Sequence, residues 1–323
     1  MAFLRGALLA AVLAIPLLAV AQNYPNRPVR MIVGFPPGGG TDILARIVAQ
    51  KLSESWKQQV VVENRPGASA TIAATVVARA APDGYVLSMG QLTPNAIAPA
   101  LQQAGLQYDP LKDFAPIVLV GTSPNVLVVY PGLPVRTLAE LTAHARAQGK
   151  PMTYATSGAG SLQHIAAELY RSMAGVQLVH VPFKGSGQAA IDLMAGQVDM
   201  NFDSVPATIQ HIRSGKLRAL AVTAAKRAGG GLEEVPTVAE SGYPGYDLTT
   251  WWGLFAPAGT PNDIMEKVNT DTVAALRAAD VRERLAALSV EPGGGSRAEF
   301  AAYVRAEIAK YERIVKQLAI KGD

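Results

Sequence analysis

Short runs of β-branched residues alternate with helical segments along most of this chain, and this alternation restricts the possible folds more than any other feature. Strands are predicted where such a run is bounded by turn residues. The predicted strands are Val29–Val33, Val60–Glu63, Val86–Met89, Ile117–Val120, Val126–Val129, Met152–Tyr154, Leu178–Val181, Val198–Phe202, Leu217–Val222 and Trp251–Ala256. Because βα alternation is typical of a mainly parallel sheet with helices on both faces, the sequence predicts an α/β protein with two such units.

The predicted helices suggest how the two units are connected. These helices are Leu44–Leu52, Ala70–Ala80, Leu138–Ala147, Leu162–Ala174, Ala189–Ala195, Ala207–Arg213, Pro261–Ala278 and Arg297–Leu318. In the last helix, Phe300, Val304 and Ile308 begin an apolar stripe that needs a partner surface, and we expect the first unit to provide it.

The chain is therefore expected to leave the first unit near Thr122 and to return near Thr250. This predicts two lobes, one formed by residues 22–123 and 250–323 and the other by residues 124–249. Two connecting segments between lobes permit opening and closing about a hinge.

The first 21 residues have the pattern of a cleavable signal peptide. Arg5 precedes an apolar stretch from Ala7 to Val20, and Ala19 and Ala21 form an A-x-A end. The stretch is shorter than the roughly 20 residues that span a bilayer, which disfavours the alternative of a retained anchor. We expect cleavage after Ala21 and export of a free protein to the periplasm.

Composition excludes several classes of function. The chain has no cysteine, so disulfides, Cys-ligated zinc and lipid attachment through an N-terminal Cys are ruled out. Its net charge of +4 is spread without dense clusters, which gives no footprint for nucleic acid. No H-E-x-x-H or G-x-S-x-G motif is present. We expect no cofactor and no metal.

The most informative segment, Gly34–Asp42, lies between the first strand and its helix. Open parallel sheets bind ligands at the carboxyl ends of their strands, and glycines let the backbone approach a ligand beside a helix start. The spacing approaches that of a P-loop, but Gly40 stands where the lysine is needed, which disfavours a nucleotide. The segment is interpreted as an anion site, the alternative being a tight turn with no ligand.

Later strand-to-helix junctions repeat this design and leave alternatives open. Ser161 is expected to cap a helix, whereas His164 lies off the core face and either contacts ligand or is solvated. Lys184 either balances a second acidic group or is solvated. Asp203 is assigned first to helix capping and second to a hydrogen bond with a ligand hydroxyl or ammonium group. Trp251 and Trp252 should face opposite ways, so one of them can reach a cleft between the lobes.

Many ordered motifs give the chain a resemblance to the exported solute receptors of the tripartite tricarboxylate transporter family, also called Bug-type receptors. These motifs are Tyr24–Pro28, Gly34–Asp42, Val62–Ala68, Ala81–Tyr85, Tyr108–Phe114, Ser157–Glu168, Val181–Gly185, Gly196–Asp199, Gly215–Val222 and Pro236–Gly242. The resemblance implies a two-lobed type II periplasmic-binding-protein fold, with a small organic acid held in the cleft by backbone amides and waters.

By position, the resemblance assigns ligand-binding roles to both lobes. The first jaw would consist of Phe35, Gly39, Gly40, Thr41 and Asp42, and the second of Thr156, Ser157, Gly158, Ser161 and His164, with Lys184 and Asp203 peripheral. Gln91 is also expected to bind the ligand, because the side chains around Gln91–Asn95 and Trp252 should determine which acid is bound. Pro94 and Asn95 stand where such receptors often have Thr and His, and Phe183 where Tyr is frequent.

The expected function is a non-catalytic, monomeric receptor that presents a small carboxylate to membrane permease subunits. The alternatives are a ligand sensor that feeds a signalling partner and a secreted hydrolase that uses Ser157, Ser161 or His164. The spacing of Ser161 and His164 is that of a helix cap, which disfavours the hydrolase.

Overall fold

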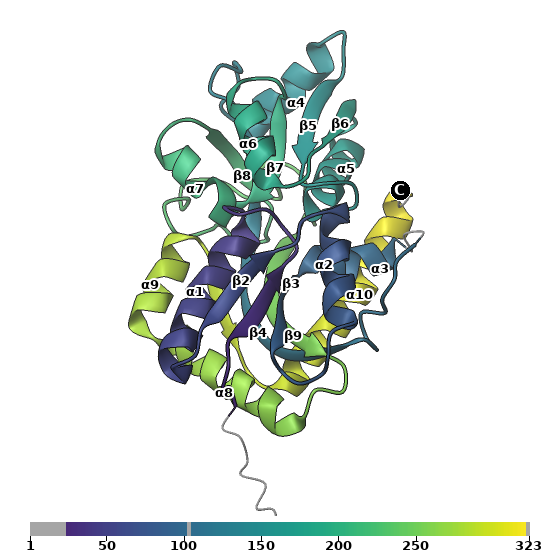
Figure 1. The fold of residues 1–323 in the computed structure, drawn as a ribbon. Helices are drawn as coiled ribbons and strands as arrows, with labels where there is room; N and C mark the ends of the chain where they lie inside the picture. The colour runs from purple at the N-terminus through teal and green to yellow at the C-terminus, as the bar shows by residue number, and fades with distance from the viewer. Residues whose placement is uncertain (1–23, 102–104, 321–323) are drawn as a thin grey trace, which may run out of the picture.

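The computed structural model describes residues 24–101 and 105–320 and has two lobes, one above the other in Figure 1. Each lobe contains strands that are flanked by helices. This arrangement confirms the expected two-lobed α/β architecture. The expected signal peptide and its cleavage site lie outside the described residues. Among the described residues, no helix combines the length and apolarity needed to cross a bilayer.

Parallel pairing forms the centre of each lobe. In the first lobe β1 pairs in parallel with β2 and β3, and in the second lobe β5 pairs in parallel with β6 and β7. These strands have the bounds β1 (Val29–Val33), β2 (Val60–Asn64), β3 (Val86–Gln91), β5 (Met152–Thr156), β6 (Leu178–Pro182) and β7 (Met200–Ser204). The carboxyl ends of these strands, where the predicted site residues lie, therefore meet between the lobes.

Antiparallel strands join the two lobes. The sequence predicts separate strands at Ile117–Val120 and Val126–Val129, but the structure has one strand of 16 residues, β4 (Phe114–Val129). Its first part pairs with β9 (Thr249–Pro257), and its last part, from Asn125, pairs with β7 and with β8 (Arg218–Val222). The prediction was wrong because Gly121 and Pro124 look like a break, whereas pairing with β9 continues through both.

Helices cover both faces of each sheet. Those of the first lobe are α1 (Gly40–Trp56), α2 (Thr71–Ala78), α3 (Ala98–Ala100), α8 (Asn262–Arg277), α9 (Ala279–Ala287) and α10 (Arg297–Leu318), with a 3-10 turn at Ala68–Ala70 and a π-helical turn at Thr93–Ile97. Those of the second lobe are α4 (Leu138–Ala147), α5 (Leu162–Ala174), α6 (Ser186–Met194) and α7 (Val205–Arg213).

The apolar stripe of α10 covers the first lobe as expected. Phe300 packs against Phe255 and Trp251 of β9, with ring centroids 5.1 and 5.9 Å apart. A Cβ atom at Gly253 would lie 2.1 Å from Phe300 Cζ, so this close contact requires glycine on the strand. The helix also contacts α5 of the second lobe.

Two elements near the C-terminus are absent from the prediction. Ala278 is extended and ends α8, so the chain changes direction and forms α9. The segment Glu291–Gly294 then forms β10, which pairs antiparallel with β4. No β-branched residue marks this strand; a Cβ at Gly293 would lie 2.3 Å from Leu119 O, so its close approach depends on glycine.

Candidate ligand-binding cleft

A cavity of about 40 Å³ lies between the lobes, and we call it the cleft cavity. It is lined by Phe35, Pro36, Gly39, Gly40, Thr41, Gln91, Thr93, Asn125, Ser157, Leu162, Gln163, Ser186, Asp203, Ser204, Thr250 and Trp252. Roughly three water molecules fill such a volume. The structure therefore shows a nearly closed cleft.

Direct contacts between the lobes hold the cleft closed. Ser69 Oγ donates a hydrogen bond to Ala159 O at 2.7 Å. A Cβ atom at Gly185 would lie 2.6 Å from Pro36 Cδ, and one at Gly40 would lie 2.8 Å from Ser204 Oγ. Both glycines therefore let a side chain of the opposite lobe approach the backbone closely.

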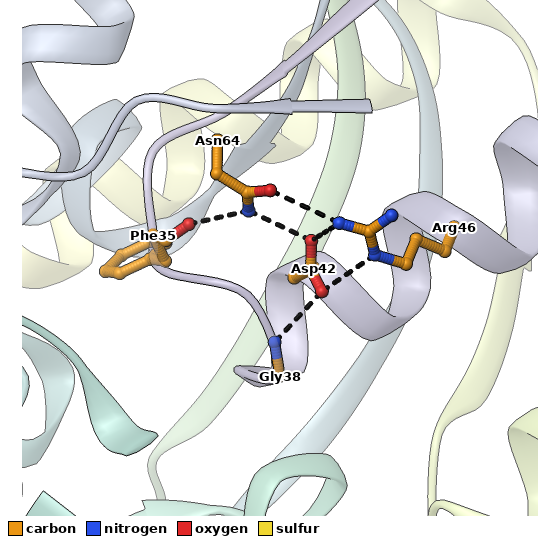
Figure 2. A network of polar contacts seen from close by, with 5 residues as sticks. All are labelled: Phe35, Gly38, Asp42, Arg46 and Asn64. Atoms are coloured by element: carbon orange, nitrogen blue, oxygen red, sulfur yellow. Dashed lines mark hydrogen bonds and ion pairs between the residues drawn. The ribbon is translucent and has the colours of Figure 1, made fainter. Parts of the chain in front are cut away.

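The loop after β1 is shaped by a polar network around Asp42, which Figure 2 shows. The Asp42 carboxylate accepts hydrogen bonds from Gly38 N at 3.0 Å and from two guanidinium nitrogens of Arg46, each at 2.9 Å. Asn64 Nδ2 donates to Asp42 Oδ1 at 2.9 Å and to Phe35 O at 2.8 Å. The structure places Asp42 in this network and not on the cleft cavity.

These hydrogen bonds also set the ionisation of Asp42. Burial alone would raise the pKa of its carboxyl, but the hydrogen bonds from Arg46, Gly38 and Asn64 hold the pKa below the ordinary value of 3.8. A carboxyl with a lowered folded pKa stabilises the fold above its unfolded pKa, and this contribution disappears as the pH falls through the folded pKa.

Asp42→Asn is therefore expected to lower the free energy of unfolding at neutral pH by about 1 to 3 kcal/mol, because charge-assisted hydrogen bonds are lost. Urea unfolding of both proteins should show this difference shrinking below about pH 4. A difference that stays constant down to pH 3 would contradict the assigned role of the carboxylate.

Three helices begin at the cleft cavity without a side-chain cap. The N-cap residue of α1 is Gly39, which has no side chain to cap the helix. Gly40 and Thr41 in the first turn of α1 line the cavity. Helices α6 and α7 also lack side-chain caps, and Ser186 and Ser204 at their starts line the same cavity. The first N–H groups of a helix have no acceptor within it, and the helix dipole is positive there. The arrangement is suited to holding a negatively charged group.

Three of the predicted second-jaw positions maintain the loop between β5 and α5. Ser161 Oγ accepts from His164 N at 3.3 Å, which confirms the expected cap. The ring of His164 stacks on that of His180 with centroids 4.3 Å apart, and its Nδ1 accepts from Gly160 N at 3.1 Å. His180 Nε2 lies 2.7 Å from Thr156 Oγ1. Thr156, Ser161 and His164 thus support the loop and do not line the cleft cavity.

The other second-jaw residues divide between two pockets. Ser157 lines the cleft cavity, and its N–H donates to Gln163 Oε1. Gly158 and Lys184 line a neighbouring pocket, which shares Phe35 and Ser157 with the cleft cavity. Lys184 is therefore peripheral to the small cavity.

Asp203 is fully buried at the end of β7 and lines the cleft cavity. Its Oδ1 accepts from Ser186 Oγ and Ser204 N, both at 2.7 Å, and also from Gln163 Nε2. Burial raises the pKa of the Asp203 carboxyl despite hydrogen bonds from Ser186, Ser204 and Gln163. The expected capping role is met only in part, since Asp203 accepts the Ser204 N–H whereas Ser204 makes no side-chain cap.

The crossing strand β9 supplies one wall of the cavity. Trp252 lines it and donates from Nε1 to Thr41 Oγ1 at 3.0 Å, whereas Trp251 donates to Glu307 Oε2 at 3.2 Å. This confirms that the two tryptophans face opposite ways. Gln91 lines the cavity as predicted and donates to Thr250 Oγ1 at 3.0 Å.

Several polar lining residues are absent from the prediction. They are Thr93, Asn125, Gln163, Ser186, Ser204 and Thr250. Asn125 alone carries a sequence signal, because a polar residue directly precedes the buried run Val126–Val129. The described residues hold no cluster of three or more His, Cys, Asp or Glu that could bind a metal ion.

Comparison with known proteins points to one family. The family profile described as tripartite tricarboxylate transporter family receptor matches residues 44–320. The protein BugT of Bordetella pertussis is 36% identical over 302 residues, which are 93% of this chain and 92% of BugT. The protein of the tcbD-tcbE intergenic region of Pseudomonas sp. strain P51 is 38% identical over 304 residues, 93% of this chain and 89% of that protein.

Solved structures give the same result. The structure of R. palustris Rpa4515 with adipate superposes with a TM-score of 0.90 at 38% identity and covers 93% of this chain and 100% of that one. MatC from Rhodopseudomonas palustris with bound malate has a TM-score of 0.85 at 35% identity, and the match covers 90% of this chain and 100% of MatC. Together with the structure of the periplasmic binding protein BugD, at a TM-score of 0.88, they confirm the periplasmic-binding-protein fold.

Proposed function

Because the chain belongs to the tripartite tricarboxylate transporter receptor family, we propose that it captures a small organic carboxylate between its lobes. Relatives in this family were solved with adipate and with malate, which are both dicarboxylates. The observation that carries the proposal is the start of α1, which has no side-chain cap and lies on the nearly closed cavity between the lobes. Its amides offer hydrogen bonds to an anion without a cationic side chain.

The expected affinity follows from a few such bonds. Each charge-assisted bond from an amide to a carboxylate contributes roughly 1.5 to 3 kcal/mol. Several of them together with closure of the cleft reach about −8 kcal/mol, a dissociation constant near 1 μM. The absence of an Arg clamp among the lining residues that the structure describes fits a receptor that accepts several related acids.

The predicted residues receive distinct roles in this proposal. Those that contact the ligand are Phe35, Gly39, Gly40, Thr41, Gln91, Ser157 and Asp203. Those that position the loops are Asp42, Thr156, Ser161 and His164, while Gly158 and Lys184 border the neighbouring pocket. The engagement of Ser161 as a helix cap and of His164 Nδ1 by Gly160 N supports a binding role over hydrolysis.

Opening of the cleft is part of the proposal. A diacid with eight or more heavy atoms needs more space than roughly three waters occupy, so ligand entry requires the lobes to separate. We place the boundaries at residues 123/124 and 249/250. The change of pairing partners along β4 supports the first boundary, and the beginning of β9 supports the second.

The cellular role follows from the family. We propose that the loaded receptor, a monomer, delivers its acid to membrane permease subunits after export and cleavage at Ala21. Mass spectrometry of the intact periplasmic protein should give the mass of a chain that begins at Gln22. A mass that corresponds to a different first residue would contradict this cleavage site. Loss of the gene without loss of uptake of the bound acid would favour a sensor instead.

Binding should depend on the negative charge of the ligand. Calorimetry and thermal unfolding with succinate, malate, adipate and citrate are expected to show at least one acid that binds at about 1 μM. The neutral diamide of that acid is the matched control and should not bind, because it has no carboxylate to accept the amides of α1. Binding of neutral sugars with no response to any acid would overturn the proposal.

A further inference from the structure

Two residues that line the cleft cavity, Asp203 and Asn125, have side-chain oxygens with unused acceptor capacity. The Oδ1 atom of Asp203 already accepts three donors, from Gln163, Ser186 and Ser204. Its Oδ2 atom, in contrast, accepts one long bond of 3.3 Å from Asn201 Nδ2. In the part of the chain that the structure describes, four neutral donors bind this buried carboxylate, and Oδ2 retains capacity for a further donor.

Asn125 supplies a second acceptor at the cavity. Its side chain is buried and its Nδ2 donates to Phe202 O at 2.9 Å, which identifies the other amide atom as Oδ1. Its backbone N and O are both occupied by Thr223. Asn125 Oδ1 has no hydrogen-bond partner among the described residues, although the residue lines the cavity. A buried acceptor left unpaired is costly, so the site is incomplete without a donor.

The charge of the cavity also indicates that the ligand should bring a hydrogen-bond donor. Asp203 is the sole ionisable side chain among the described lining residues. An unsubstituted dicarboxylate would place two further negative charges beside it with no cation. A hydroxyl or ammonium hydrogen on the ligand would give Asp203 a partner and relieve the repulsion.

The donor must lie close to a carboxylate of the ligand. The starts of α1 and α7 face each other, because a Cβ at Gly40 would lie 2.8 Å from Ser204 Oγ. Ser204 follows Asp203 directly and is bound to it through its N–H. The anion position at α1 and the acceptor position at Asp203 are therefore neighbours.

We propose that the cleft selects acids that carry a hydroxyl or ammonium group on the carbon next to a carboxylate. The amides of α1 hold the carboxylate, and Asp203 Oδ2 and Asn125 Oδ1 accept the hydrogens of the substituent. This inference rests on the proposed carboxylate-binding function and specifies its ligand class.

Matched acids test the inference on the wild-type protein. The sets are succinate with malate and aspartate, glutarate with 2-hydroxyglutarate and glutamate, and adipate with 2-aminoadipate. Within each set that binds, a substituted acid should bind at least about tenfold more tightly than the unsubstituted one, as measured by calorimetry. Comparison of the hydroxy acid with the amino acid in each set shows whether the cleft prefers a hydroxyl or an ammonium donor.

The variant Asp203→Asn should weaken this preference, most strongly for the amino acids, because its NH2 group at the Oδ2 position cannot accept and an ammonium group has no lone pair to accept from it. The variant is expected to fold, since its oxygen can retain the three donors to Oδ1. Asn201 now presents its Nδ2 to Oδ2, so its amide has to turn over for Oδ1, which lacks a partner among the described residues, to accept from the new NH2 group. Asp192→Asn, on α6 outside the cavity lining, is the matched control and should keep the wild-type preference.

The outcomes separate this inference from the function on which it rests. Equal binding of substituted and unsubstituted acids by the wild type, or an unchanged preference in Asp203→Asn, would overturn the inference and leave carboxylate binding intact. Failure of every acid in all sets to bind would overturn both.

Discussion

Gly40→Val is expected to weaken binding of the carboxylate ligand by about 100-fold or more, with little change in the unfolding temperature of the unliganded protein. A Cβ at this position would lie 2.8 Å from Ser204 Oγ and 3.5 Å from Pro206 Cβ, both on the opposite lobe. The two methyl groups of valine add to this clash, so the closed state becomes unfavourable. The backbone at Gly40 is helical, so valine causes no backbone strain there. Within its own lobe the added Cβ would lie 3.3 Å from Trp252 Cζ2, a contact that a shift of a few tenths of an ångström relieves.

The chain offers a matched control for this substitution. Gly187 also lies in the first turn of a helix, but a Cβ there would meet nothing within 4 Å. Gly187→Val should therefore bind the ligand like the wild type. Calorimetry gives both affinities, and small-angle scattering should show compaction on ligand addition for the control only. Undiminished binding by Gly40→Val would show that closure at this contact is not required.

Trp252→Ala is expected to lower the free energy of unfolding by about 3 to 5 kcal/mol, which is the usual cost of removing a large buried aromatic side chain. The side chain is 1% exposed, packs in the core of the first lobe and donates to Thr41 Oγ1 at 3.0 Å. Its loss leaves a large void behind α1 and frees the Thr41 hydroxyl. Urea unfolding monitored by circular dichroism measures the change.

Trp252→Phe separates packing from the hydrogen bond. It keeps most of the apolar contact but cannot donate to Thr41, so a smaller cost of about 1 to 2 kcal/mol is expected. A loss below about 1 kcal/mol for Trp252→Ala would contradict the assignment of Trp252 to the core behind the binding loop.

The helices whose ends the sequence predicted correctly are those with local start signals. The bounds of α4, α5 and α10 agree with the prediction, and these helices have side-chain caps from Thr137, Ser161 and Ser296. Helices α6 and α7 begin earlier than the predicted Ala189 and Ala207, and neither has a side-chain cap. A helix start that is left open for a ligand lacks the residue that would mark it in the sequence.

The sequence predicted the candidate site correctly only where its residues are contiguous in one segment of the chain. The loop from Gly34 to Asp42 has its glycines and its helix start in one segment, and the structure places Gly39, Gly40 and Thr41 on the cavity. Asn125 and Gln163 come from a strand and a helix far along the chain. Their approach to Asp203 depends on how the strands and helices pack in three dimensions, and no local sequence pattern predicts this packing.

The central claim is that the open start of α1 binds the carboxylate inside a closing cleft. The most direct measurement is an amide ¹⁵N–¹H spectrum of labelled protein during titration with a bound acid. The Gly40 and Thr41 resonances should shift downfield more than those of the capped helix starts at Leu138 and Arg297, because only the former gain a charged acceptor. Saturable binding with the Gly40 and Thr41 signals unmoved would contradict the account.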